Sequence, residues 1–144
     1  MKMELEFLNS FRDKYMLTEQ GKGVFLTGVL LGYMARLQVQ RVEDVGNAPL
    51  FKQMNFGRMT LRDLKKHIAR MPELLKAYQM KYPAHLQKLA NAAGDMLLKG
   101  EEKELGVDGN FTFTVGFTNA PFFFWEKIFP REQPAEDSEE AVSE

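Results

Sequence analysis

The longest apolar stretch, from residue 24 to residue 35, is the feature that most constrains the fold of this chain. The run is 12 residues long and is closed by Lys22 on one side and by Arg36 on the other. A membrane-spanning helix needs about 20 apolar residues, so the run is too short to cross a bilayer. We therefore expect a helix that is buried in the core of a globular protein.

Apolar residues lie on more than one face of this helix, which we predict over about residues 19–41 with Thr18 as its N-cap. Such a helix belongs at the centre of a bundle or in a subunit contact. Gly28 and Gly32 are four residues apart, and small residues at this spacing let a second helix approach closely. We interpret the pair as close packing inside a core rather than as a membrane dimer motif.

Helix signals recur along the rest of the chain. Thr60 and Asp63 resemble a capping box, and prolines mark the first turns of further helices. Residues 110–119 alternate apolar and polar side chains as a strand does, but a single strand among helices would leave its edges unpaired, so we expect a helix there and keep the strand as the alternative. The remaining helices are predicted over about residues 3–15, 50–54, 60–70, 72–81 and 83–99.

The expected fold class is all-α, a compact bundle of about five or six helices over residues 1–129. Residues 130–144 are acidic, with two prolines and few apolar residues, which predicts a disordered tail. The chain has no cysteine, so packing rather than disulfides must stabilise it. The first residues mix both charge signs and lack the apolar run of a secretory signal, so we expect a cytoplasmic location.

Charge is segregated along the chain although its net value is only -1. Residues 34–88 contain eleven Lys and Arg against four Asp and Glu, whereas residues 89–144 contain four against twelve. A basic patch of this kind is the footprint of nucleic-acid binding, and the alternative is an ordinary charged helix surface. Our candidate phosphate-binding residues are Arg58, Arg62, Lys65, Lys66, Arg70, Arg36, Arg41 and Lys52.

Side chains that could carry catalysis or bind a metal are few. The two histidines, His67 and His85, are eighteen residues apart on different predicted helices, which is not a metal-binding spacing. The acidic residues between 101 and 108 lack the pattern of a calcium loop. We therefore expect no enzyme activity, no cofactor and no metal.

Aromatic residues crowd together near the carboxyl end of the chain, at Phe122, Phe123, Phe124 and Trp125. Four consecutive aromatic side chains cannot all point to one side of a helix. We predict that part of this cluster meets a partner protein, the alternative being that the cluster is wholly internal.

Three strings carry a family resemblance: FLTGVLLGYMARLQ, then NAPLFKQMNFGRMTLRDLKKHIARMPELL, then FTFTVGFTNA. In this order they resemble the carboxyl-terminal region of the type I-B CRISPR Cascade large-subunit family over roughly residues 7–120. The corresponding segments are Phe25–Gly28, Ala48–Phe56, Asp63–Leu74 and Phe113–Gly116. The last segment departs from the family's pattern, because this chain has the letters VGF where the family has FVLG.

The resemblance implies a non-catalytic small subunit of a Cascade surveillance complex in antiviral defence. Its implied partners are the backbone and large subunits of the complex, neighbouring copies of itself, and target DNA paired with the guide RNA. It would hold the target and displaced strands of the R-loop open through phosphate contacts. The alternative function is a purely structural adaptor that joins subunits and does not contact nucleic acid.

Overall fold

The computed structural model describes residues 2–100 and 104–130, and within these ranges every regular element is a helix. This confirms the all-α class, whereas the predicted tail falls almost entirely outside the described residues. In chain order the helices are η1 (Glu6–Ser10), η2 (Tyr15–Leu17), α1 (Glu19–Leu37), η3 (Val42–Asn47), α2 (Pro49–Lys52), α3 (Leu61–Ala77), α4 (Pro83–Leu98), α5 (Gly106–Thr118), α6 (Ala120–Phe122) and η4 (Phe123–Ile128).

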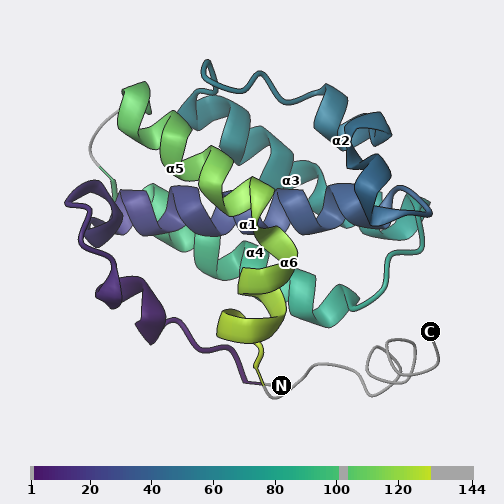
Figure 1. The fold of residues 1–144 in the computed structure, drawn as a ribbon, viewed down its shortest axis with the longest axis horizontal. Helices are drawn as coiled ribbons and strands as arrows, with labels where there is room; N and C mark the ends of the chain where they lie inside the picture. The colour runs from purple at the N-terminus through teal and green to yellow at the C-terminus, as the bar shows by residue number, and fades with distance from the viewer. Residues whose placement is uncertain (1, 101–103, 131–144) are drawn as a thin grey trace.

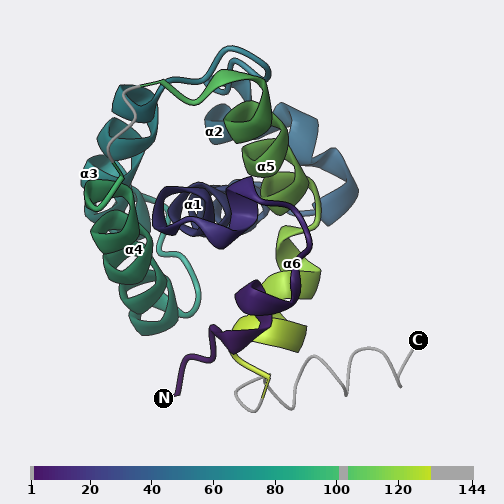
Figure 2. The ribbon, with the colours of Figure 1, turned by 90° about the vertical axis from the view of Figure 1, so that its left-hand side faces the viewer.

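Helix α1 runs through the middle of the molecule, as the apolar run predicts (Figure 1). Seen close to end-on, α1 has α3 and α4 on one side and α5 and α6 on the other (Figure 2). Its first turn is capped as expected, because the Thr18 hydroxyl accepts a hydrogen bond of 2.9 Å from the backbone N–H of Gly21. The helix ends at Leu37, four residues before the predicted end.

Glycines let α1 and α5 pack closely, which confirms the interpretation of Gly28 and Gly32. A Cβ atom on Gly28 would collide with the carbonyl oxygen of Phe113, and one on Gly116 would lie 2.5 Å from the carbonyl oxygen of Phe25. Only glycine fits at these positions because no side-chain atom can share that space. The two helix backbones are therefore in direct contact along the core.

The strand-like segment 110–119 is helical and belongs to α5, so the expected helix is confirmed. The polar residues that produce the alternation are accommodated inside the helix. The hydroxyl of Thr114 donates to the carbonyl oxygen of Asn110 one turn earlier, and the Asn110 side chain accepts a 2.7 Å hydrogen bond from the backbone N–H of Met59. Asn110 thus fixes the loop before α3 against α5.

Helix α3 corrects one boundary prediction. Its capping box forms as expected, with Asp63 N–H donating to the Thr60 hydroxyl and Thr60 N–H donating to the Asp63 carboxylate. The helix does not stop at Arg70 but continues through Pro72 to Ala77, so the two predicted helices are one. Proline costs a backbone hydrogen bond, and α3 tolerates this loss at Pro72, directly after the fully buried Met71.

The amino-terminal segment was expected to form one helix over residues 3–15, and this prediction is wrong. It forms the two short 3₁₀ helices η1 and η2 instead. Phe7 and Phe11 both pack their rings on Phe25 of α1, with centroids 6.3 and 5.5 Å apart, and the N–H of Glu4 donates to the carbonyl oxygen of Ile128. Because of these contacts, the segment runs across the bundle along a path that one straight helix could not take.

Candidate nucleic-acid interface

The outer face of α3 carries the strongest concentration of predicted phosphate-binding residues. Arg62, Lys65 and Lys66 are exposed on this face, while Leu64 and Met71 on the opposite side of the helix are fully buried. The exposed residues border a shallow hollow of about 460 Å³. Its lining consists of Leu61, Arg62, Lys65, Lys66 and Ala69. We call the exposed cations Arg58, Arg62, Lys65, Lys66 and Arg70 the α3 face.

Two further cations extend the α3 face at its ends. Arg58 lies in the loop before the Thr60 cap, and Arg70 lies one turn beyond Lys66. Within the part of the chain that the structure describes, no side chain of the α3 face takes part in a hydrogen bond or ion pair. These charges are therefore available to an external anion.

His67 lies between the α3 face and the core. Burial lowers the pKa of His67 below its usual value, Asp63 opposes this shift, and the positive charges of Arg70 and Lys66 add to it. The imidazole is therefore neutral at neutral pH and adds no charge to the face.

The predicted phosphate-binding residue Arg36 lies away from the α3 face, where backbone carbonyl oxygens hold its side chain. Its Nη1 donates to the carbonyl oxygens of Gly32 and Phe117 at 2.8 and 2.9 Å, and its Nη2 donates to that of Thr118 at 3.0 Å. The guanidinium is half-buried and ties α1 to the end of α5. A residue held in this way cannot reach out to a phosphate on the α3 face.

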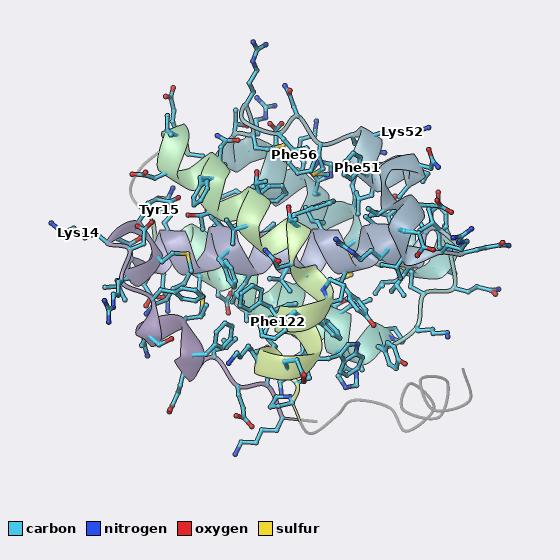
Figure 3. All side chains as sticks on the ribbon, viewed as in Figure 1. Lys14, Tyr15, Phe51, Lys52, Phe56 and Phe122 are labelled. Carbon is cyan, nitrogen blue, oxygen red and sulfur yellow. The ribbon has the colours of Figure 1, made fainter. Side chains whose placement is uncertain are left out.

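Arg41 and Lys52 also lie outside the α3 face. Arg41 forms an ion pair with Glu43 at 2.6 Å, and this hydrogen bond lowers the pKa of the Glu43 carboxyl. Lys52 ends α2 and projects from it (Figure 3). The eight predicted cations therefore form one group of five and three separate residues.

The aromatic cluster near the carboxyl end is mostly internal, and two of its four predicted partner residues, Phe124 and Trp125, are buried. Phe124 stacks on Tyr33 with ring centroids 4.1 Å apart, and Trp125 is buried beside it. Phe123 is half-buried against Phe25. The π-helical turn η4 directs these successive rings into different parts of the core.

Phe122 is the member of that cluster that stays exposed, at 52% of its surface (Figure 3). Two further apolar residues, which the sequence reasoning missed, are also exposed: on α5, Val107 is 87% exposed and Phe111 is 65% exposed. Val107 and Phe111 are four residues apart, about one helical turn, and this spacing was the signal that could have found them. We call Val107 and Phe111 of α5, together with Phe122 of α6, the α5 face.

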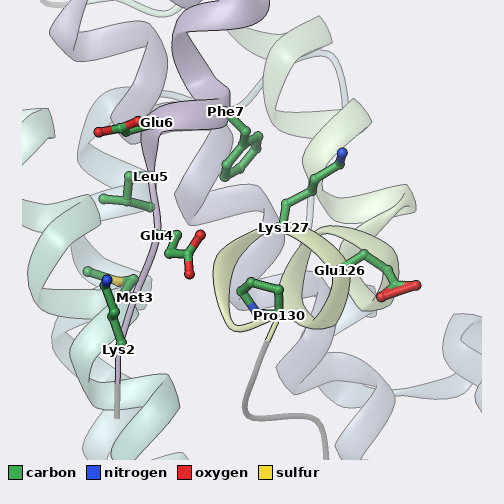
Figure 4. A pocket seen from close by; sticks show the side chains of 9 residues that line it. All are labelled: Lys2, Met3, Glu4, Leu5, Glu6, Phe7, Glu126, Lys127 and Pro130. Carbon is green, nitrogen blue, oxygen red and sulfur yellow. The ribbon is translucent and has the colours of Figure 1, made fainter.

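Another hollow, with a volume of about 610 Å³, lies where the two ends of the described chain meet (Figure 4). Residues 2–7 form one wall, and Glu126, Lys127 and Pro130 form the other. Two lysines and three glutamates line it, so their charges nearly cancel. It has neither the cationic character of a phosphate site nor the apolar lining of a small-molecule site.

Among residues 2–100 and 104–130, no group of three or more His, Cys, Asp or Glu is placed to hold a metal ion. His85 packs its ring against Phe129 in the core, with centroids 4.8 Å apart, far along the chain from His67 on α3. In the same part of the chain no helix is long and apolar enough to cross a membrane.

Comparison with known proteins adds one finding. The family profile described as CRISPR-associated protein TM1802 (cas_TM1802) C-terminal domain matches residues 2–128. No curated protein and no solved structure matches the chain. The matched residues span all the helices from η1 to η4, including the α3 face and the α5 face. This chain therefore belongs to the family of the CRISPR-associated protein TM1802 C-terminal domain.

Proposed function

We propose that the chain is a non-catalytic small subunit of a type I-B Cascade surveillance complex in the cytoplasm. In this role it works with other CRISPR-associated subunits and with neighbouring copies of itself. It binds the opened target and displaced DNA strands of the R-loop through their phosphates, while pairing with the guide RNA selects the sequence. It needs no cofactor, because its part is to hold strands rather than to react with them.

The α3 face is the observation that carries this proposal. Three exposed cations, Arg62, Lys65 and Lys66, border one hollow on a helix of 17 residues, which is about 25 Å long. Phosphates repeat along a nucleic-acid strand, so a row of cations on a rigid helix suits backbone contacts that do not depend on sequence. Because α3 and α5 lie on opposite sides of α1, nucleic acid on α3 leaves α5 open to a protein subunit (Figure 2).

Binding by the isolated subunit should be weak, because its net charge is only -1. Several copies in one complex would place several α3 faces along one strand. The linked contacts then add through effective concentration rather than through the affinity of one subunit.

A structural adaptor remains the second candidate, and the α5 face favours it. Val107, Phe111 and Phe122 expose apolar surface that a monomeric protein gains nothing by exposing. In this alternative the α5 face joins neighbouring subunits and the α3 face contacts only acidic protein.

Charge reversal in the reconstituted complex separates the two functions. The test variant changes Arg62, Lys65 and Lys66 to Glu, and the matched control changes the exposed Arg12, Lys14 and Lys99 to Glu. Both variants replace one Arg and two Lys, so their net charges are equal. If the test variant assembles but loses DNA affinity while the control keeps it, the proposal holds. If both assemble and bind DNA as the unchanged protein does, the adaptor function replaces it.

A further inference from the structure

A third hollow, of about 420 Å³, lies at the far end of α1 beside the connection between α3 and α4. It is separate from the hollow on the α3 face, since the two share no lining residue. Three tyrosines line it, so we call it the tyrosine hollow. Its lining consists of Tyr33, Arg36, Leu37, Val39, Gln40, Val42, Tyr78, Gln79, Met80, Lys81 and Tyr82.

The inner wall of the tyrosine hollow is rigid and aromatic. Tyr33 is held by its stack on Phe124 and by a 2.8 Å hydrogen bond from the indole N–H of Trp125 to its hydroxyl. The ring of Tyr82 packs edge-on against Trp125, with centroids 4.9 Å apart. These rings cannot turn away without breaking core contacts, so the wall keeps its shape.

The outer rim of the hollow exposes an aromatic ring beside a cation. Tyr78 is 41% exposed, Val42 on the other side is 54% exposed, and Lys81 is exposed three residues after Tyr78. An exposed ring with an apolar neighbour offers a planar base a surface to stack on, and a nearby Lys offers a contact to its phosphate.

Positive charge also reaches the inner part of the hollow. The hydrogen-bond partners of Arg36 are neutral carbonyl oxygens, so its half-buried charge is not cancelled by a carboxylate. Helix α4 starts at Pro83, directly after the last lining residue, and its N-terminus has no side-chain cap. The partial positive charge of that helix end adds to the charges of Arg36 and Lys81.

The backbone that builds the rim is held in an uncommon conformation. Gln79 and Tyr82 have φ of 47° and 59° and are the non-glycine residues with positive φ in the described part of the chain. At Gln79 the chain closes α3, with the N–H of Met80 donating to the carbonyl oxygen of Leu75. Residues kept in this region at an energetic cost cluster at binding sites, and both of these line the same hollow.

We infer that the tyrosine hollow binds one unpaired nucleotide of a single-stranded nucleic acid, with its base on Tyr78 and its phosphate toward Lys81 and Arg36. The inference rests on the proposed function, which brings single strands to this protein. Helix α3 ends at Ala77, so a strand that follows the α3 face toward the helix end arrives at Tyr78. The hollow would then hold the strand at one point, whereas the α3 face holds it along its length.

Trp125 provides a direct measurement, because it is the only tryptophan of the chain and its ring touches both Tyr33 and Tyr82. The full chain is titrated with thymidine 5′-monophosphate and with a short oligothymidylate while the emission of Trp125 is followed. Inorganic phosphate is the control ligand. We expect both nucleotide ligands to change the emission to saturation, and phosphate alone to leave it unchanged.

Variants test whether the change arises at the hollow. Tyr78→Ala should weaken binding of the oligothymidylate by about fivefold to a hundredfold, the range of one stacked base, and Lys81→Gln should weaken it further in combination. Phe111→Ala is the matched control, because it removes an exposed ring on α5 instead. Circular dichroism checks that each variant is folded.

The outcomes separate this inference from the proposed function. The tyrosine hollow is overturned as a nucleotide site if neither nucleotide changes the emission of Trp125. It is also overturned if Tyr78→Ala and Lys81→Gln leave the emission change intact. If that occurs while reversal of the α3 face still abolishes DNA binding by the complex, the proposed function survives alone. If the hollow binds nucleotide while reversal of the α3 face has no effect, the hollow survives and the α3 face is not the DNA contact.

Discussion

The indole N–H of Trp125 donates a buried hydrogen bond to the hydroxyl of Tyr33 across 92 residues of sequence, at 2.8 Å. This bond joins η4 to the C-terminal part of α1 and places the aromatic cluster inside the molecule. Removing the Tyr33 hydroxyl would leave the indole N–H buried without this acceptor. A buried donor that loses its partner costs about 1–3 kcal/mol.

We therefore predict that Tyr33→Phe lowers the free energy of unfolding by about 1–3 kcal/mol in urea denaturation. Tyr78→Phe is the matched control, because Tyr78 is an exposed residue. It should change stability by less than about 0.5 kcal/mol. Equal effects of the two variants would mean that the bond between Trp125 and Tyr33 does not stabilise the fold.

Close contact between α1 and α5 leads to a second prediction. Gly28→Ala should lower the free energy of unfolding by at least about 1–3 kcal/mol, because its new methyl group would collide with backbone atoms of α5. Gly94→Ala is the control, since a Cβ atom there meets nothing within 4 Å and the position lies inside α4. That variant should gain about 0.5–1 kcal/mol from helix propensity. Thermal denaturation of both proteins checks the opposite signs.

His67 gives a prediction about pH. Its pKa is lower in the folded state than in the unfolded chain, so between these two values the unfolded state binds more protons. Stability should thus be constant above the ordinary pKa of about 6.5 and fall as the pH drops below it. His67→Gln should lose less stability than the unchanged protein between about pH 7.5 and pH 5.5, as measured by urea denaturation. If the free energy of unfolding depends on pH equally in the two proteins, a lowered pKa of His67 is contradicted.

The α5 face should matter for assembly and not for folding. Phe111→Ser and Phe122→Ser should leave stability nearly unchanged because both rings are exposed, but they should reduce incorporation of the subunit into the reconstituted complex. Phe124→Ser should instead cost about 3–5 kcal/mol of stability, since that ring is fully buried. Full incorporation of the double serine variant, measured by size-exclusion chromatography, would remove the α5 face as a subunit contact.

The sequence could predict the structural features that depend on residues close together in the chain. The Thr18 cap and the capping box of Thr60 and Asp63 depend on groups three residues apart, and both form. The central helix followed from its apolar length alone. Pro72 suggests a helix boundary, but α3 continues through it to Ala77, so this local signal did not predict where the helix ends.

Contacts between distant segments account for what the sequence did not indicate. Two of the three carbonyl oxygens that hold Arg36 lie 81 and 82 residues away, so no local pattern shows that its guanidinium is held. Phe124 and Trp125 looked available because a π-helical turn, which the sequence does not announce, directs them inward. The tyrosine hollow joins two segments that are distant in the sequence, 33–42 and 78–82, so no local pattern indicated it.

The salt dependence of target-DNA binding by the reconstituted complex tests the central claim most directly. If the α3 face contacts phosphates, changing Arg62, Lys65 and Lys66 to Glu should weaken DNA binding. It should also reduce the slope of log affinity against log salt concentration by about 2, the value for the loss of three phosphate contacts to a single strand in each subunit. The matched reversal of Arg12, Lys14 and Lys99 should leave the slope unchanged. An unchanged slope in the α3 variant, with the complex fully assembled, would contradict a phosphate-binding role for this face.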